Sequence, residues 1–137
     1  MADCSLMTRI AGFRVHRGAL AAVHRPRAED LTLDRLVGRL RGRTALRGVL
    51  AAGITNVDNI GALFRNAAAF GADAVVLDGT CCDPLYRKAV RVSVGHVLSV
   101  PFAVADDFPA AIDRVRQELN MRVLAIEAGR GGDPLCE

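Results

Sequence analysis

The sequence has 137 residues, of which 51% are hydrophobic, 4% are aromatic and none is Trp. This length suits one domain whose core is built from Ala, Val, Leu and Ile, and such residues favour layered helices and a parallel sheet. The net charge of +3 hides an asymmetry: residues 1–50 carry ten Arg against four acidic residues, whereas the rest carries eight basic against eleven acidic residues.

Two interpretations of this charge pattern stay open. A basic N-terminal part and a mildly acidic C-terminal part fit an arm that faces a polyanion and is joined to a catalytic core. Alternatively, the arginines form an ordinary solvated surface in a protein from an Arg-favouring genome, since Lys88 is the only lysine.

The sequence also argues against several classes of protein. It has no run of about 18 apolar residues and no apolar leader at its start, so we expect neither a membrane span nor a signal peptide. Its cysteines form no C-x-x-C pair, which suits neither a zinc site nor a disulfide framework. We therefore expect no metal, reduced thiols and a cytoplasmic location. The four cysteines are Cys4, Cys81, Cys82 and Cys136.

The apolar pattern predicts the elements in chain order. Alternation at Phe13, Val15 and Arg17 predicts a short strand, and a helical spacing further on predicts a helix that Thr32 or Asp34 caps. The apolar residues of that helix are Leu33, Leu36, Val37 and Leu40.

Strands and helices then alternate to the end of the chain. The predicted strands are 46–51, 74–77, 100–104 and 122–126, and the predicted helices are about 59–70, 84–92 and 108–119. This alternation at short spacing is typical of an α/β fold with a parallel sheet and right-handed crossovers. In such sheets the ligand site lies at the carboxyl ends of the strands.

The first segment with a chemical pattern is 53–71, which follows a strand and opens a helix. A step of about 100° per residue separates two faces. The apolar face predicts a core stripe, and the other face carries small residues around one cation, as if it lay under a backbone or a ligand. The first face comprises Ile60, Leu63, Phe64, Ala67 and Phe70, and the second comprises Gly61, Ala62, Arg65 and Ala69.

The pattern Asn56-x-x-Asn59-x-Gly61-x-x-x-Arg65-x-Ala67 resembles the first motif of the SpoU (TrmH) family. Members transfer a methyl group from S-adenosylmethionine to a ribose 2′-hydroxyl of tRNA or rRNA, so the resemblance implies that Asn59 and Arg65 are catalytic. A guanidinium, with a pKa above about 12, is a poor base, so Arg65 is better suited to bind a phosphate and orient the hydroxyl. On the residues alone, Asn59 as a helix cap and Arg65 as a solvated cation remain alternatives.

The second segment is 81–103. Asp83-Pro84 predicts a helix start, and Arg87 and Arg91 stand at i and i+4 with Lys88 beside them. Like charges at that spacing repel mildly, so they suit either a bound phosphate or a solvated face.

This segment resembles the family's D-P-x-x-x-K-A-x-R-x-S-x-G-x-x-x-x-x-P pattern. The resemblance implies that Arg87, Lys88, Arg91 and Ser93 bind the RNA backbone. The matching residues are Asp83, Pro84, Lys88, Ala89, Arg91, Ser93, Gly95 and Pro101.

The resemblance also implies an organisation of the chain. Gly12-Phe13-x-x-His16-Arg17-Gly18 is similar to the linker strand of longer members, so we expect a basic arm and linker over 1–45 and the first part of the methyltransferase domain over 46–137. His16 is more often structural or RNA-facing than catalytic in such a place.

The expected fold is a Rossmann-like parallel sheet of the SPOUT (α/β knot) type, truncated before the knot. The family's later segments, which thread the knot, bind S-adenosylmethionine and form a homodimer, have no match here, so no cofactor-binding residue is expected in this chain. A truncated enzyme, an enzyme completed by a second polypeptide and a non-catalytic RNA-binding relative remain open. A flavodoxin-like domain would need a phosphate loop that Gly53 and Gly61 do not make.

Overall fold

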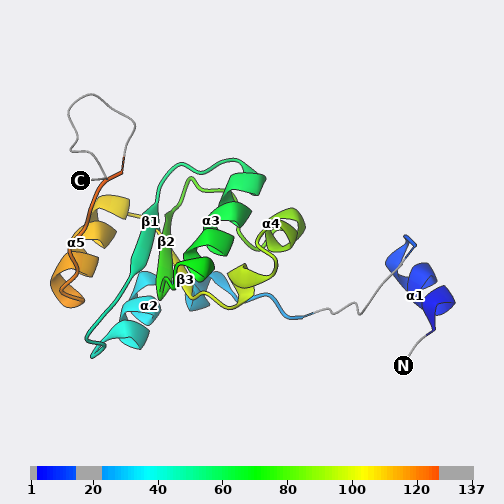
Figure 1. Ribbon diagram of the computed structural model, residues 1–137, viewed down its shortest axis with the longest axis horizontal. Coiled ribbons are helices and arrows are strands. Elements are labelled where there is room, and N and C mark those ends of the chain that lie inside the picture. The colour runs from blue at the N-terminus through cyan, green and yellow to red at the C-terminus, as the bar shows by residue number, and fades with distance from the viewer. Residues whose placement is uncertain (1–2, 15–22, 127–137) are drawn as a thin grey trace.

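The computed structural model describes residues 3–14 and 23–126, which form a parallel sheet between two layers of helices (Figure 1). The strands are β1 (Gly48–Ala51), β2 (Ala74–Asp78) and β3 (Phe102–Ala105), in the order β1-β2-β3. The helices are α1 (Cys4–Ala11), α2 (Leu33–Leu40), α3 (Val57–Ala69), α4 (Arg87–Val92) and α5 (Phe108–Glu118), with short 3₁₀ helices η1 (Ala28–Asp30) and η2 (His96–Leu98). The predicted α/β class and parallel sheet are confirmed.

The two faces of the sheet form two apolar cores because strand side chains alternate. Val75 and Leu77 of β2 face α3, where they pack with the buried Ile60 and Phe64. On the opposite face, Ala74 and Val76 pack with buried residues of α2 and α5, among them Leu36, Leu40 and Ala111. In Figure 1, α5 lies on one side of the strands and α3 and α4 lie on the other.

Side chains at the helix starts explain where three helices begin. Thr32 accepts a hydrogen bond from the Arg35 amide, Asn56 accepts from the Asp58 amide at 2.8 Å, and Asp107 accepts from the Ala110 amide at 3.0 Å. Each acceptor satisfies an amide that has no partner within its helix. Asn56 is therefore the cap of α3, and the alternative in which Asn59 caps this helix is wrong.

Several predicted boundaries need correction. The strand expected at 100–104 begins only at Phe102, and the helix expected at 84–92 begins at Arg87, because the Asp83 carboxylate accepts the Leu85 amide within a turn instead of starting a helix. Phe70, placed in the core stripe, is exposed because α3 ends before it. The strand expected at 122–126 does not form in the structure.

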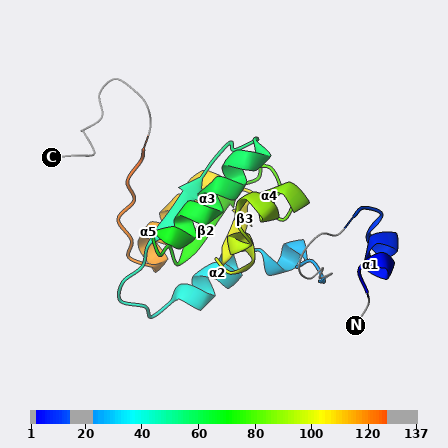
Figure 2. The same ribbon diagram turned by 45° about the vertical axis from the view of Figure 1, so that its right-hand side comes forward.

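The N-terminal part also differs from its prediction. Residues 4–11 form α1, which the pattern did not predict, and Figure 2 shows this helix separate from the sheet and its helices. Phe13 and Arg14 are not in a strand, and the rest of that predicted strand, with His16, lies outside the described residues. Within the predicted arm, α2 packs on the sheet and buries Leu36, Val37 and Leu40, while the boundary at 45/46 stays a prediction.

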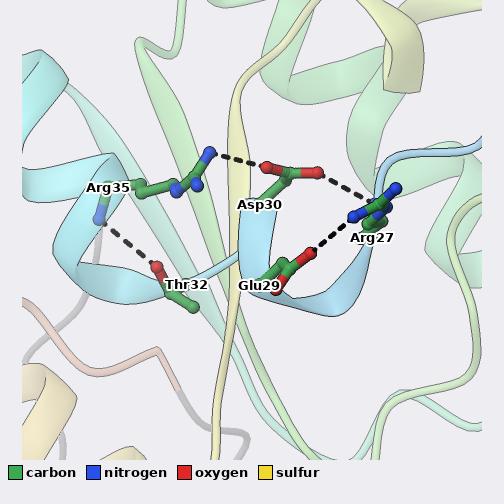
Figure 3. A network of polar contacts seen from close by, with 5 residues as sticks. All are labelled: Arg27, Glu29, Asp30, Thr32 and Arg35. Atoms are coloured by element: carbon green, nitrogen blue, oxygen red, sulfur yellow. Dashed lines mark hydrogen bonds and ion pairs between the residues drawn. The ribbon is translucent and has the colours of Figure 1, made fainter.

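Ion pairs hold the segment that leads into α2. Arg35 contacts the Asp30 carboxylate at 2.6 Å, and Asp30 also accepts the Arg27 amide at 3.1 Å (Figure 3). This segment runs along the outer edge of the sheet, where the Val104 amide donates to the Leu31 carbonyl at 2.9 Å. Arg27 and Arg35 of the basic half therefore contact the protein itself.

Helices α3 and α4 approach so closely that one position between them accepts only glycine. A Cβ atom on Gly61 would lie 2.7 Å from Val92 Cβ and 2.8 Å from the Ala89 carbonyl oxygen. The small face predicted around Gly61 therefore lies under another backbone, and that backbone belongs to α4. Among the described residues, no helix has the length and apolar character needed to cross a membrane.

We predict that Gly61→Ala lowers the free energy of unfolding by about 1–3 kcal/mol, because the added methyl group meets backbone that cannot move aside easily. Chemical denaturation measures this change. Gly38→Ala in α2 is the matched control, because its Cβ meets nothing within 4 Å. This control should stabilise the helix by about 0.5–1 kcal/mol. Equal effects of the two substitutions would contradict the close approach.

Candidate RNA-binding and catalytic site

The outer face of α4 presents a cluster of cations. Arg87, Lys88 and Arg91 are all exposed, and together with Tyr86 and Val92 they line a surface groove of about 530 Å³, which we call the α4 groove. The predicted cationic face is confirmed as a face of one helix. This arrangement brings three positive charges close enough to act on the same phosphate backbone.

Helix α3 holds α4 through polar contacts on both sides of Gly61. The Lys88 ammonium pairs with the Asp58 carboxylate at 2.8 Å, and the Arg65 guanidinium donates to the Val92 carbonyl at 3.5 Å. Asp58 and Arg65 lie on one face of α3 because seven residues make nearly two turns. Arg65 is therefore positioned at the carboxyl end of α4, where a positive charge also interacts favourably with the helix dipole.

Asn59 and Arg65 are both exposed on α3, but the structure does not bring them together. Six residues separate them by about 9 Å along the helix and about 120° around it. Neither side chain lines the α4 groove. Their assignment as a catalytic pair therefore stays a prediction.

Ser93 cannot bind RNA in this structure, which corrects its predicted role. Its side chain is fully buried, and its hydroxyl donates to the Val90 carbonyl at 2.9 Å. The same oxygen accepts the Val97 amide at 3.4 Å. Gly95 follows in the left-handed region, with φ of 81°. This part of the motif therefore ends α4 and turns the chain toward β3.

Two residues of the N-terminal half reach the start of α4, and the motifs did not identify either contact. Both guanidinium nitrogens of Arg25 contact the Asp83 carboxylate, at 2.7 and 3.1 Å. The Arg87 guanidinium lies 5.3 Å from the centre of the Phe13 ring, in a cation–π arrangement. Among residues 3–14 and 23–126, Arg91 makes no ion pair.

At the carboxyl ends of β1 and β2, a set of contacts joins the two loops that lead into α3 and α4. Asp78 is central to this loop junction: one of its oxygens accepts the amides of Gly53, Thr80 and Cys81 at 3.0–3.2 Å. The Cys82 amide also donates to the Ile54 carbonyl at 2.8 Å. The sequence pattern that could have indicated this joining role is an acidic residue, Asp78, at the end of the buried strand β2.

Hydrogen bonding sets the charge state of the loop junction. The pKa of Asp78 is lowered from 3.8 to about 2, because Cys81 and then Thr80 hydrogen-bond to its carboxylate. Burial raises the pKa of the Cys81 thiol above its usual value, so this cysteine stays protonated and is a poor nucleophile. The cysteines among the described residues are all free.

The described residues do not provide a site that fits S-adenosylmethionine. A cavity of about 810 Å³ lies along β1 between α2, α5 and residues 121–126, and its lining is mainly apolar. Its charged residues are Arg47, Asp73 and Arg122. Arg47 and Asp73 lie directly before β1 and β2, at the opposite end from where a parallel sheet binds ligands, and Arg122 lies in the segment after α5. In the described ranges, no cluster of three or more His, Cys, Asp or Glu side chains could hold a metal ion.

Comparison with known proteins gives a consistent result. A sequence model of the SpoU rRNA Methylase family matches residues 47–137. An uncharacterized tRNA/rRNA methyltransferase of Mycobacterium tuberculosis is 41% identical over 125 residues, which are 91% of this chain and 41% of the relative. One from Haemophilus influenzae is 29% identical over 97% of this chain and 36% of its own length. The chain thus spans about two fifths of the length of these relatives.

Solved structures agree with the sequence relatives. The SpoU methyltransferase AviRb from Streptomyces viridochromogenes, in complex with the cofactor AdoMet, has a TM-score of 0.53 and 30% identity, over 61% of this chain and 33% of AviRb. An RNA 2′-O ribose methyltransferase has a TM-score of 0.50 and 29% identity, over 58% of this chain and 30% of its own.

We predict that Asp78 makes the protein sensitive to acid. Because its pKa is lower in the folded state, its contribution to stability is complete above about pH 4 and disappears as the pH falls through about 2. Asp78→Asn removes the charge and keeps the shape. The difference in unfolding free energy between wild type and variant should therefore shrink between pH 4 and the lowest pH at which folding is measurable. A constant difference over that range would exclude this role.

Proposed function

The chain belongs to the SpoU rRNA Methylase family, and on that premise we propose that it is part of an RNA methyltransferase. The proposed reaction transfers the methyl group of S-adenosylmethionine to a ribose 2′-hydroxyl of tRNA or rRNA. The observation that carries the proposal is the α4 groove, where three exposed cations lie beside the helix that bears both amide and guanidinium of the first motif.

The cations of α4 suit an RNA backbone better than a small anion. They lie along one exposed helix face, so they can follow several phosphates at once, and each phosphate contact releases a bound counterion. Arg91 is the most available of them, since Lys88 pairs with Asp58 and Arg87 contacts Phe13. Phosphate contacts of this kind position the RNA and carry no sequence information.

In this proposal Arg65 orients the ribose. Its contact with the Val92 carbonyl at 3.5 Å is weak, so the guanidinium can turn to a phosphate at little cost. A guanidinium keeps its proton at neutral pH, so Arg65 acts through hydrogen bonds and charge, not as a base. The exposed Asn59 amide can donate to and accept from the sugar.

Other parts of the enzyme are proposed to lie outside the described residues. S-adenosylmethionine supplies the methyl group, and we propose that the remaining part of a longer protein binds it. We also propose that the complete enzyme is a cytoplasmic homodimer. The AdoMet bound to AviRb supports the choice of cofactor.

A non-catalytic RNA-binding role is the second candidate. It is favoured by one observation: the described residues carry a cationic groove, but the apolar cavity beside β1 does not fit the cofactor. Calorimetry of this chain with S-adenosylmethionine separates the two candidates. Binding of S-adenosylmethionine would favour the enzyme. No detectable binding of S-adenosylmethionine, together with retained RNA binding, would favour the second role.

We predict that Arg91→Ala weakens the binding of RNA by this chain to the same extent for every RNA sequence. The slope of log affinity against log salt concentration should become shallower by about 0.7–0.9, because one phosphate contact is lost. Filter binding across a salt series measures the slope. Arg116→Ala is the matched control, since this exposed arginine lies on α5, across the sheet from α4. An unchanged slope for Arg91→Ala would remove this residue from the interface.

In a full-length relative, we predict that Ala at the position matching Arg65 lowers kcat about 100-fold or more, because misplacing the reacting hydroxyl removes the advantage of orientation. Folding and RNA affinity should change little. Single-turnover methyl transfer and RNA binding, measured on the same variant, check this. Full activity would exclude Arg65 from the reaction.

A further inference from the structure

An exposed aromatic ring stands among the cations of the α4 groove. Tyr86 lines this groove with Arg87, Lys88 and Arg91, and 56% of its surface is exposed. It is the N-terminal cap residue of α4, and its side chain makes no capping hydrogen bond. More than half of the residue's surface is therefore available to a ligand.

The backbone that carries Tyr86 is held firmly. Its amide donates to the Asp83 carbonyl at 3.2 Å, and the Asp83 carboxylate accepts the Leu85 amide at 2.9 Å. Arg25 contacts the same carboxylate with both terminal nitrogens. Pro84 within this turn is buried. A fixed turn presents the ring in one place, so little conformational freedom is lost when a partner packs on it.

A second aromatic ring lies near Arg87. Phe13 is 46% exposed, and its ring centre is 5.3 Å from the Arg87 guanidinium carbon. The surface therefore combines rings and cations: Tyr86 lines the groove with Arg87, Lys88 and Arg91, and Phe13 lies near Arg87. A face that bound only phosphates would need the cations alone.

Rings and cations together suit one form of nucleic acid. Bases stack on aromatic side chains, and arginine and lysine bind the adjoining phosphates, but this requires bases that are unstacked and unpaired. In an RNA duplex the base faces are covered by neighbouring pairs, so a duplex could use the cations but not the rings.

We infer that Tyr86 is a base-stacking residue and that the α4 groove binds an unpaired nucleotide of single-stranded RNA. This inference rests on the proposed RNA-directed function and defines its substrate: a loop, bulge or single strand in which the base lies on Tyr86 and the flanking phosphates contact Arg87 and Arg91. Lys88 joins them when its pairing with Asp58 opens.

The composition of the chain provides a direct test. Tyr86 is the only tyrosine and there is no tryptophan, so the tyrosine emission of the full chain reports on this ring alone. A single-stranded oligouridylate should quench this emission, because a stacked base deactivates the excited ring. A duplex RNA of equal phosphate number, and inorganic polyphosphate, should bind in a salt-dependent way without comparable quenching.

Variants separate stacking from charge. Tyr86→Ala should weaken oligouridylate binding by about 5- to 100-fold and leave polyphosphate binding unchanged. Tyr86→Phe keeps the ring, so its affinity for oligouridylate should lie within about twofold of that of wild type. Phe70→Ala is the control, because this aromatic is 77% exposed at the far end of α3 and does not line the groove. It should have no effect on either ligand. Labelled-RNA anisotropy measures all four proteins.

Three results would overturn the inference, and they differ in what they mean for the proposed function. If oligouridylate binds with the expected salt dependence but without quenching, and Tyr86→Ala binds like wild type, stacking is excluded while RNA binding stands. Equal quenching by duplex and single strand would likewise exclude the preference for unpaired RNA. If no RNA binds at all, both the inference and the RNA-binding part of the proposed function fail.

Discussion

The close approach of α3 and α4 at Gly61 is the constraint on which the candidate site depends. No larger residue fits there, because Val92 and the Ala89 carbonyl lie where a Cβ would be. With the two helices in contact, Lys88 reaches Asp58 and Arg65 reaches the end of α4. Arg65 and the cations of α4, which belong to two motifs separated along the chain, thereby become neighbours on one rigid surface.

The loop junction at the carboxyl ends of β1 and β2 fixes where these helices start. Asp78 receives amides from both loops, and its charge is favoured by those bonds, so the junction is strongest when the carboxylate is ionised. Because both helices leave the same edge of the sheet, their exposed faces remain on one side of the molecule. The loop junction therefore positions the exposed faces of α3 and α4 without being part of them.

Charge composition and charge availability differ in this chain. The N-terminal half is rich in arginine, but Arg35, Arg41 and Arg43 are paired with Asp30, Glu118 and Asp73. Such exposed pairs contribute little stability each, yet they reduce the charge offered to a polyanion. In the proposed function, the few cations of α4 contribute more to RNA binding than the many of the arm, because they lie close together on one helix and line a groove with Tyr86.

The sequence by itself determined the α/β class, the strand at 74–77, a helix with Leu33, Leu36, Val37 and Leu40 on one face, and the family, because apolar periodicity and residue spacing are local properties. It also predicted a strand at 46–51, of which 48–51 form β1. It could not place the 84–92 helix start or exclude a strand at 122–126, since a strand needs a partner that pattern alone does not supply. Tertiary structure alone decided that Ser93 is buried, that α4 packs against Gly61 of α3, and that Arg25 reaches the Asp83 carboxylate. These outcomes depend on contacts between segments distant in the chain, and local spacing carries no information about which segments meet.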